Sequence, residues 1–144
     1  AFYNESLKQQ ADKFSKGVYD RITTGYSYTN LDYANAMRAR EIWKLELVKI
    51  FNSVDIILSP TLPTLVPPVE EDKSLLEATK DATRNTYAGA LGQIPGLSIP
   101  CGFTSDGLPI GLQLEAAWWE DPLLLRVGHS FQGQTDWHLQ KPKM

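Results

Sequence analysis

The chain has 144 residues, of which 42% are hydrophobic and 22% are charged, values typical of one soluble globular domain and not of a disordered segment. Its formal net charge is −3 and its basic residues are scattered, which argues against nucleic-acid binding through phosphate neutralisation. No apolar run approaches the roughly 20 residues that span a bilayer, so we expect no membrane partner.

The first part of the chain is predicted to be mainly helical. Residues 4–16 contain good helix formers behind a capping candidate, Asn4. The longest helical pattern covers residues 31–52, with Thr29 or Asn30 as its cap. It carries two apolar stripes, and we therefore expect it to pack on two sides, which a larger protein body would supply more readily than this chain. The first stripe is Leu31, Ala34, Ile42, Leu45 and Val48, and the second is Ala36, Ala39, Trp43, Leu47 and Ile50.

The middle of the chain combines a strand, a proline-rich loop and a helix. The β-branched run at 54–59 predicts a buried strand. An extended loop is then expected, because four prolines each fix φ and lack an N–H: Pro60, Pro63, Pro67 and Pro68. Residues 74–91 are predicted to form one helix with a small face at Ala78, Ala82 and Gly89, beside a polar, uncharged face at Thr79, Thr83, Thr86 and Tyr87.

A hairpin and a final helix are predicted in the last third. Strands at 97–103 and 110–114 are joined through a turn that contains Asp106-Gly107. Asp121 caps the helix and Pro122 occupies its first position, ahead of an apolar stripe of Leu123, Leu124, Val127, Gly128 and Phe131. Helices alternate with strands along the chain, so the predicted fold class is α/β.

Few residues suit nucleophilic or metal chemistry. His129 lies off the apolar stripe of its helix and His138 lies in a polar tail, so both are interpreted as surface histidines. Cys101, the single cysteine, has no visible activating partner; it can form no internal disulfide, which fits a cytoplasmic location. The spacing of these three residues matches no metal site, and no phosphate-binding glycine motif occurs, so no metal or cofactor is expected.

Two groups of residues keep alternative interpretations. Thr83 and Tyr87 are one helical turn apart, and their shared face is either an ordinary surface or a binding wall. Trp118-Trp119 belongs to the core, to a partner surface or to the wall of a pocket.

Several strings, in order along residues 18 to 138, resemble amidase-signature enzymes. Residues 92–102 (GQIPGLSIPCG) are similar to the late "G-x-P-x-x-S-x-P-x-G" segment of that family, and residues 106–114 (DGLPIGLQL) to its "G-L-P-x-G-L-Q" strand. Further matches are 21–25 (RITTG), Asp32-Tyr33 with Ala36 and Arg40, 55–63 (DIILSPTLP), 124–127 (LLRV) and 135–138 (TDWH). Each string alone is weak, and their shared order carries the resemblance.

The resemblance implies an α/β/α fold around a large mixed sheet flanked by helices, of which residues 1–144 form the C-terminal portion. It implies hydrolysis of amide or related C–N bonds by a serine nucleophile, served by a second serine and a lysine and by an oxyanion hole. In the family these groups lie in a Gly/Ser-rich signature far upstream, which this sequence does not contain. We therefore expect no catalytic residue here, an inactive isolated chain, and a partner segment or companion chain that carries the Ser-Ser-Lys triad.

The resemblance also implies three substrate-binding residues for a small-molecule amide. In the family, the helix before the "P-x-x-S-x-P" strand lines the substrate channel, and those positions fall on Thr83 and Tyr87. An aromatic residue after the "G-L-Q" strand reaches the channel in some members and falls near Trp119. Many members carry Asn where Ala90 stands, so the polar network around that Asn is not expected here.

Relatives that handle charged amino-acid amides tend to place a charge on this wall, whereas Thr83 and Tyr87 are neutral, which favours neutral amides, anilides or carbamates as substrates. Two alternatives remain: part of the A subunit of a glutamine-dependent amidotransferase, and a non-catalytic binding or scaffold fragment.

Overall fold

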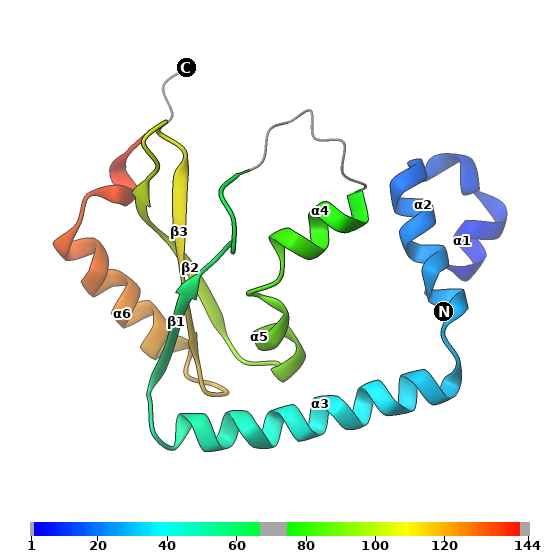
Figure 1. Ribbon diagram of the computed structural model, residues 1–144, viewed down its shortest axis with the longest axis horizontal. Coiled ribbons are helices and arrows are strands. Elements are labelled where there is room, and N and C mark those ends of the chain that lie inside the picture. Colours follow the sequence, from blue (N-terminus) through cyan, green and yellow to red (C-terminus); the bar gives the residue numbers. More distant parts are fainter. Residues whose placement is uncertain (1, 67–74, 142–144) are drawn as a thin grey trace.

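The structure is a computed structural model that describes residues 2–66 and 75–141 (Figure 1). Pro67 and Pro68 of the expected loop and Ser74, the expected start of a helix, lie outside the described residues. The helices are α1 (Asn4–Gln9), α2 (Lys16–Thr23), α3 (Asn30–Phe51), α4 (Leu75–Ala82), α5 (Tyr87–Gly92) and α6 (Asp121–Gln134). Short 3-10 turns occur at η1 (Ala11–Lys13), η2 (Thr24–Ser27) and η3 (Trp137–Leu139), and the strands are β1 (Ile56–Pro60), β2 (Gly96–Phe103) and β3 (Pro109–Ala116).

The three strands form one sheet in the order β1-β3-β2, with both described pairings antiparallel. The described residues therefore contain none of the parallel pairs that a mixed sheet implies. The expected hairpin between β2 and β3 is confirmed: Thr104 N–H donates to Leu108 O at 2.8 Å, and Gly107 adopts a φ of 81°, which favours glycine. β1 was expected to be buried, but it lies at the edge of the described sheet and Leu58 is exposed.

Helix α6 covers one face of the sheet and forms the main hydrophobic core with it. Leu124 packs against Leu114 and Ile99 from the strands, and Gly128 allows Leu97 to approach the helix closely. The predicted apolar stripe of this helix is confirmed, because its members are buried or half-buried: Leu123, Leu124, Val127, Gly128 and Phe131. Figure 1 shows α5 and α6 on opposite sides of the strands.

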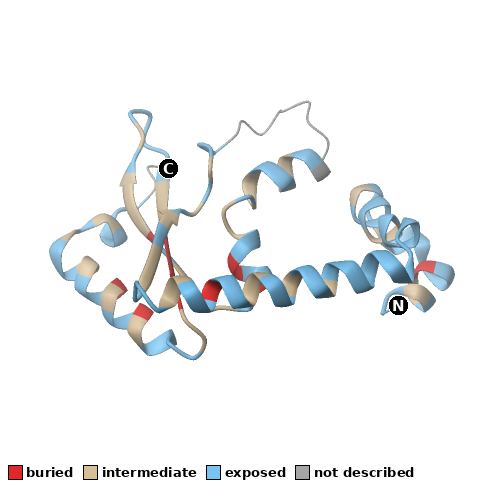
Figure 2. Cartoon of the chain, turned by 60° about the horizontal axis from the view of Figure 1, so that its bottom comes forward, coloured by how far each residue is buried: buried red, intermediate tan, exposed pale blue. Residues whose placement is uncertain are grey.

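Helix α3 begins at a capping box in which Thr29 Oγ1 accepts from Asp32 N–H at 3.2 Å and the Asp32 carboxylate accepts from Thr29 N–H at 2.8 Å. Of its two stripes, only the second is covered, and only in part: Leu47 is buried, Trp43 and Ile50 are half-buried, and Ala36 and Ala39 are exposed. Leu47 is 1% exposed against α5, and Trp43 Nε1 donates to Ala88 O at 2.8 Å. The other stripe is uncovered, as the long exposed surface of α3 in Figure 2 shows; its large members are Leu31, Ile42, Leu45 and Val48.

Two predicted helices differ from the observed ones. The helix expected at 4–16 ends at Gln9, and Asn4 does not cap it; its side chain instead accepts from Tyr26 Oη at 3.0 Å. The single helix expected at 74–91 is interrupted between Ala82 and Tyr87. In this interruption, Thr83 and Thr86 direct their hydroxyls to backbone carbonyls at 2.7 and 2.9 Å, and such local bonds compete with a continuous helix.

Candidate functional site

The face of the sheet opposite α6 is polar, and this face forms the candidate site. Because side chains alternate along a strand, Leu112, Leu114 and Ala116 of β3 point to the apolar core, and the residues between them point to α5. Those residues are Gln113 and Glu115, and Gly111 precedes them on the same face of the strand. Gln113 Nε2 donates to Asn85 O at 3.4 Å in the turn between α4 and α5, so this turn lies over the polar face.

A cavity of about 240 Å³ lies between this polar face and α5. Five of its lining residues are polar and come from strands β2 and β3, the loop after β1 and the turn before α5: Thr61, Thr86, Ser98, Gln113 and Glu115. The hydroxyls of Thr61 and Ser98 are 2.6 Å apart, which is a hydrogen-bond distance. Asn85 Nδ2 donates to Pro60 O at 2.7 Å and fastens the α4–α5 turn to the end of β1. The polar groups are therefore held by contacts between segments that are distant in sequence.

Glu115 is the single ionisable residue among the described residues that line this cavity. Burial raises the pKa of its carboxyl group above the ordinary glutamate value of 4.5, and a hydrogen bond with Gln113 opposes this rise. The carboxylate lies against Gly89 of α5, where an added Cβ would overlap Oε1. Sequence reasoning missed Glu115. The alternation of Gln113, Leu114 and Glu115 in a predicted strand is the signal that could have placed it opposite the apolar face.

The predicted substrate-binding residues lie around α5 but do not line this cavity. Thr83 is half-buried and donates its hydroxyl to Thr79 O at 2.7 Å. Tyr87 is the first residue of α5 and is 49% exposed. The helical turn between them survives the interruption, since Tyr87 N–H donates to Thr83 O at 3.1 Å. From this segment it is Thr86 that reaches the cavity.

Trp119 follows β3 and is 88% exposed with a φ of 70°, so it is not part of the core. The neighbouring residue, Trp118, donates Nε1–H to Gly92 O at 3.0 Å. This contact places the tryptophan turn at the C-terminal end of α5, whereas Tyr87 begins the same helix. The three predicted residues thus flank α5 without forming one compact cluster with the cavity.

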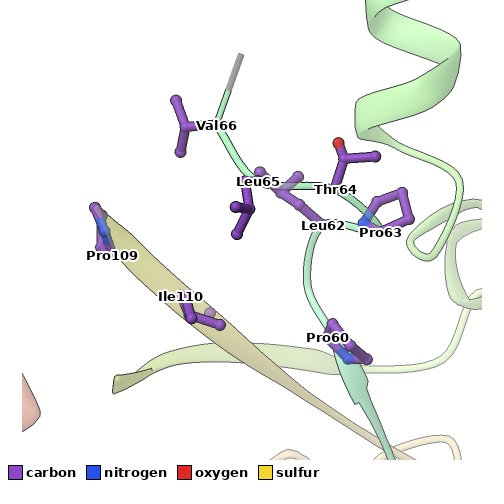
Figure 3. A pocket seen from close by; sticks show the side chains of 9 residues that line it. Pro60, Leu62, Pro63, Thr64, Leu65, Val66, Pro109 and Ile110 are labelled. Carbon is purple, nitrogen blue, oxygen red and sulfur yellow. The ribbon is translucent and has the colours of Figure 1, made fainter. Parts of the chain in front are cut away.

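A second cavity, of about 270 Å³, lies under the proline-rich loop that follows β1 (Figure 3). It is lined by Pro60, Leu62, Pro63, Thr64, Leu65, Val66, Pro109, Ile110 and Gly111. None of these lining residues is ionisable, so this cavity offers shape and apolar contact but no acid, base or charged nucleophile. A third, open hollow lies where η2 meets α3 and includes Tyr28, Asp32 and Tyr33.

The described residues hold no cluster of three or more His, Cys, Asp or Glu side chains that could bind a metal ion. His129 and His138 are both exposed, as expected from their positions in the sequence. Cys101 is half-buried and directs its thiol to Ile110 O at 3.5 Å. Among the described helices, none has the length and apolar character required to cross a membrane.

Comparison with known proteins identifies the family to which this chain belongs. The family model described as Amidase matches residues 3–125. The chain belongs to the amidase family. Members of this family are hydrolases that act on C–N bonds. The match confirms the expected family, and the described helices and sheet, together with the likeness to a solved amidase, confirm the expected α/β class.

Curated relatives of this amidase-family chain include the A subunit of glutamyl-tRNA(Gln) amidotransferase from Cupriavidus necator, which is 34% identical over 140 residues, or 94% of this chain. The protein of the same name from Rippkaea orientalis is 37% identical over 144 residues, or 95% of this chain. The chain spans 28% of the length of the first relative and 30% of the second. Most of the length of each relative therefore has no counterpart in this chain.

Solved structures agree with the family. A crystal structure of an amidase matches 92% of this chain, and 31% of its own length, with a TM-score of 0.81 and 30% identity. The structure of 6-aminohexanoate cyclic dimer hydrolase matches 92% of this chain and 30% of its own length with a TM-score of 0.78; at 21% identity, this likeness shows the fold alone.

Proposed function

We propose that this chain is the C-terminal part of a serine-dependent amidase that hydrolyses the C–N bonds of neutral amides, anilides or carbamates. The match to the amidase family over residues 3–125 carries the proposal. In this proposal the chain contributes fold and substrate pocket, and an upstream segment or a companion chain contributes the Ser-Ser-Lys triad. The described residues agree with that division of labour: both histidines are exposed and the thiol of Cys101 is directed to a backbone carbonyl, so none of these three side chains is placed as part of a nucleophile–base pair.

The proposed acyl side of the pocket is the segment that runs from Thr83 through α5, with Trp119 at its far end. Tyr87 offers an aromatic wall with a polar tip, and both Tyr87 and Trp119 are exposed in this chain. Neutral side chains on this wall favour an uncharged acyl group. Burying such a group against Tyr87 or Trp119, which lie toward opposite ends of α5, would supply apolar contact without the cost of desolvating a charge.

The test is hydrolysis by the complete protein that carries this chain. A panel of one anilide, one carbamate, one simple amide and glutamine is assayed for release of aniline, alcohol or ammonia, in parallel with labelling by a serine-directed fluorophosphonate. The proposal expects serine labelling and turnover of at least one neutral substrate in preference to glutamine. The absence of both serine labelling and turnover of every substrate would contradict the proposal and favour the non-catalytic scaffold.

A second candidate is the A subunit of a glutamine-dependent amidotransferase, because the relatives from Cupriavidus necator and Rippkaea orientalis carry a name of that kind at 34% and 37% identity. In the same panel, this candidate expects glutamine to be the preferred source of ammonia, with further stimulation by companion chains and an acceptor. A preference for glutamine of tenfold or more in kcat/KM, about 1.4 kcal/mol, would select it over the neutral amidase.

A further inference from the structure

Glu115 lies on the central strand of the described sheet, and no positively charged side chain among the described residues pairs with it. Glu115 is 8% exposed, and none of the ion pairs among residues 2–66 and 75–141 includes its carboxylate. Lys44 of α3, the helix that packs against α5, donates Nζ to Gln93 Oε1 at 3.0 Å instead. A buried carboxylate is costly unless hydrogen-bond donors or a cation compensate for the lost water. Among the described side chains, Gln113 is the one whose hydrogen bond lowers the pKa of Glu115 and so favours the ionised carboxylate.

The helix above the carboxylate leaves room for it. At Gly89, a Cβ would overlap Glu115 Oε1 and lie 3.0 Å from Cδ, so any larger residue would displace the carboxylate. The cavity beside it holds about 240 Å³, far above the roughly 10–15 Å³ that one water molecule needs. The space therefore fits a group larger than a single water.

Neutral acceptors face the same cavity. The oxygens of Thr61 and Ser98 are 2.6 Å apart, and each hydroxyl has two lone pairs, so their mutual hydrogen bond leaves free acceptor capacity on both. The remaining lining residues bring no second charge: Thr86, Gly89, Ala90, Ile94, Gly96, Leu97 and Gln113. The carboxylate lies beside Gly89 and the two hydroxyls lie beside Gly111, so the cavity offers one charged and two neutral acceptors to the N–H donors of a cationic group.

We propose that the cavity between α5 and the sheet binds one protonated nitrogen group, an alkylammonium or a guanidinium, with Glu115 as its counter-ion and the hydroxyls of Thr61 and Ser98 as neutral acceptors. A small amine and a Lys or Arg side chain from another part of the complete protein present the same chemistry. The assignment rests on the geometry of the cavity and stands apart from the proposed hydrolysis, so an inactive protein would still test it.

The experiment follows the titration of Glu115 by NMR in the complete protein, with glutamate labelled at the side-chain carboxyl carbon. Glu115→Gln identifies the signal, and the titration is repeated with methylammonium and with guanidinium. A raised pKa of Glu115 that falls toward or below 4.5 on addition of either cation assigns a small-amine site. A pKa that already lies below 4.5 without additive assigns a side chain of the protein itself. A raised pKa that neither cation lowers would overturn the proposal and leave a hydrated carboxylate.

For a small-amine site, ligand-observed NMR gives the matched comparison. Methylammonium is expected to bind at least tenfold more weakly to Glu115→Gln, and equally well to Glu120→Gln, which removes an exposed carboxylate outside the cavity. Equal affinity for the wild type and Glu115→Gln would contradict the assignment. Should Glu115→Gln fail to fold, Ser98→Ala keeps the carboxylate; it is expected to weaken methylammonium binding severalfold, and unchanged binding would count against the hydroxyl acceptors.

Discussion

At the residue scale, Gly92 sets how closely α5 approaches α3. A Cβ at this position would overlap Leu47 Cδ1 and lie 3.3 Å from Trp43 Nε1. Leu47 is 1% exposed and Trp43 is tied to Ala88 O, so neither neighbour is free to move aside. Intrinsic helix propensity favours alanine over glycine. Replacing Gly92 with alanine is therefore destabilising only if the clash of the added Cβ costs more free energy than the gain in helix propensity.

We expect Gly92→Ala to lower the free energy of unfolding of the complete protein by about 1–3 kcal/mol, as overpacking of a filled site does. The matched control is Gly133→Ala in α6, where a Cβ would meet nothing within 4 Å. That change should be neutral or stabilising by up to about 1 kcal/mol. Urea unfolding of both variants measures the difference, and equal effects would show that the α3–α5 contact is loose.

Tyr87 carries the residue-scale prediction for substrate choice. Because its side chain is 49% exposed at the start of α5, Tyr87→Ala opens no core cavity and should leave the fold intact. As a pocket wall, it should cost about 1–3 kcal/mol in transition-state binding for a substrate that fills the wall, and much less for a small one. An ordinary exposed residue would change every substrate by less than about 0.5 kcal/mol.

The measurement is kcat/KM for one large and one small amide with the complete enzyme, in the wild type and Tyr87→Ala. Tyr26→Ala is the control, since Tyr26 is 64% exposed in η2 and lines none of the three cavities described above. Unchanged selectivity between the two amides would remove Tyr87 from the site.

At the element scale, periodicity predicted helices and strands well where one face is apolar. The apolar stripe of α6 could be predicted from the sequence because the face that covers it, the even-numbered residues of β3, lies within the same chain. The break after Ala82 was not readable, because it depends on Thr83 and Thr86 bonding to their own backbone and on Asn85 reaching Pro60 O. Such contacts leave no periodic signal. For the same reason the cavity beside Glu115 could not be assembled from sequence.

Helix α3 gives the prediction at this scale. One stripe is covered by α5 only around Trp43 and Leu47, and the other stripe is exposed, so the isolated chain should bind an apolar dye strongly or aggregate. Leu45→Ser and Ile42→Ser should reduce dye binding without loss of helicity, because both side chains are exposed in this chain.

Leu47→Ala, on the covered stripe, should instead lower the free energy of unfolding by about 2–5 kcal/mol. Dye fluorescence, circular dichroism and light scattering check these outcomes. Cooperative, monomeric unfolding of the isolated chain without dye binding would show that the exposed stripe needs no partner.

At the scale of the whole molecule, the amidase family is shown by the match to residues 3–125, whereas the chain spans 28–30% of the length of the curated relatives from Cupriavidus necator and Rippkaea orientalis. The order of short motifs allowed the family to be recognised from sequence alone. Substrate choice could not be recognised in the same way, because the proposed neutral wall at Thr83 and Tyr87 and the proposed counter-ion Glu115 would bind different ligand chemistries. Thr83 and Tyr87 are not among the residues that line the cavity beside Glu115.

The most direct measurement is anilide hydrolysis by the purified 144-residue chain, alone and then mixed with a separately produced polypeptide that carries the Gly/Ser-rich signature proposed for the upstream segment or companion chain. The account predicts no turnover above background for either polypeptide alone and turnover by the mixture that a serine-directed fluorophosphonate abolishes. Hydrolysis by the isolated chain that a substitution within residues 1–144 removes would contradict it, because the nucleophile would then lie in this chain.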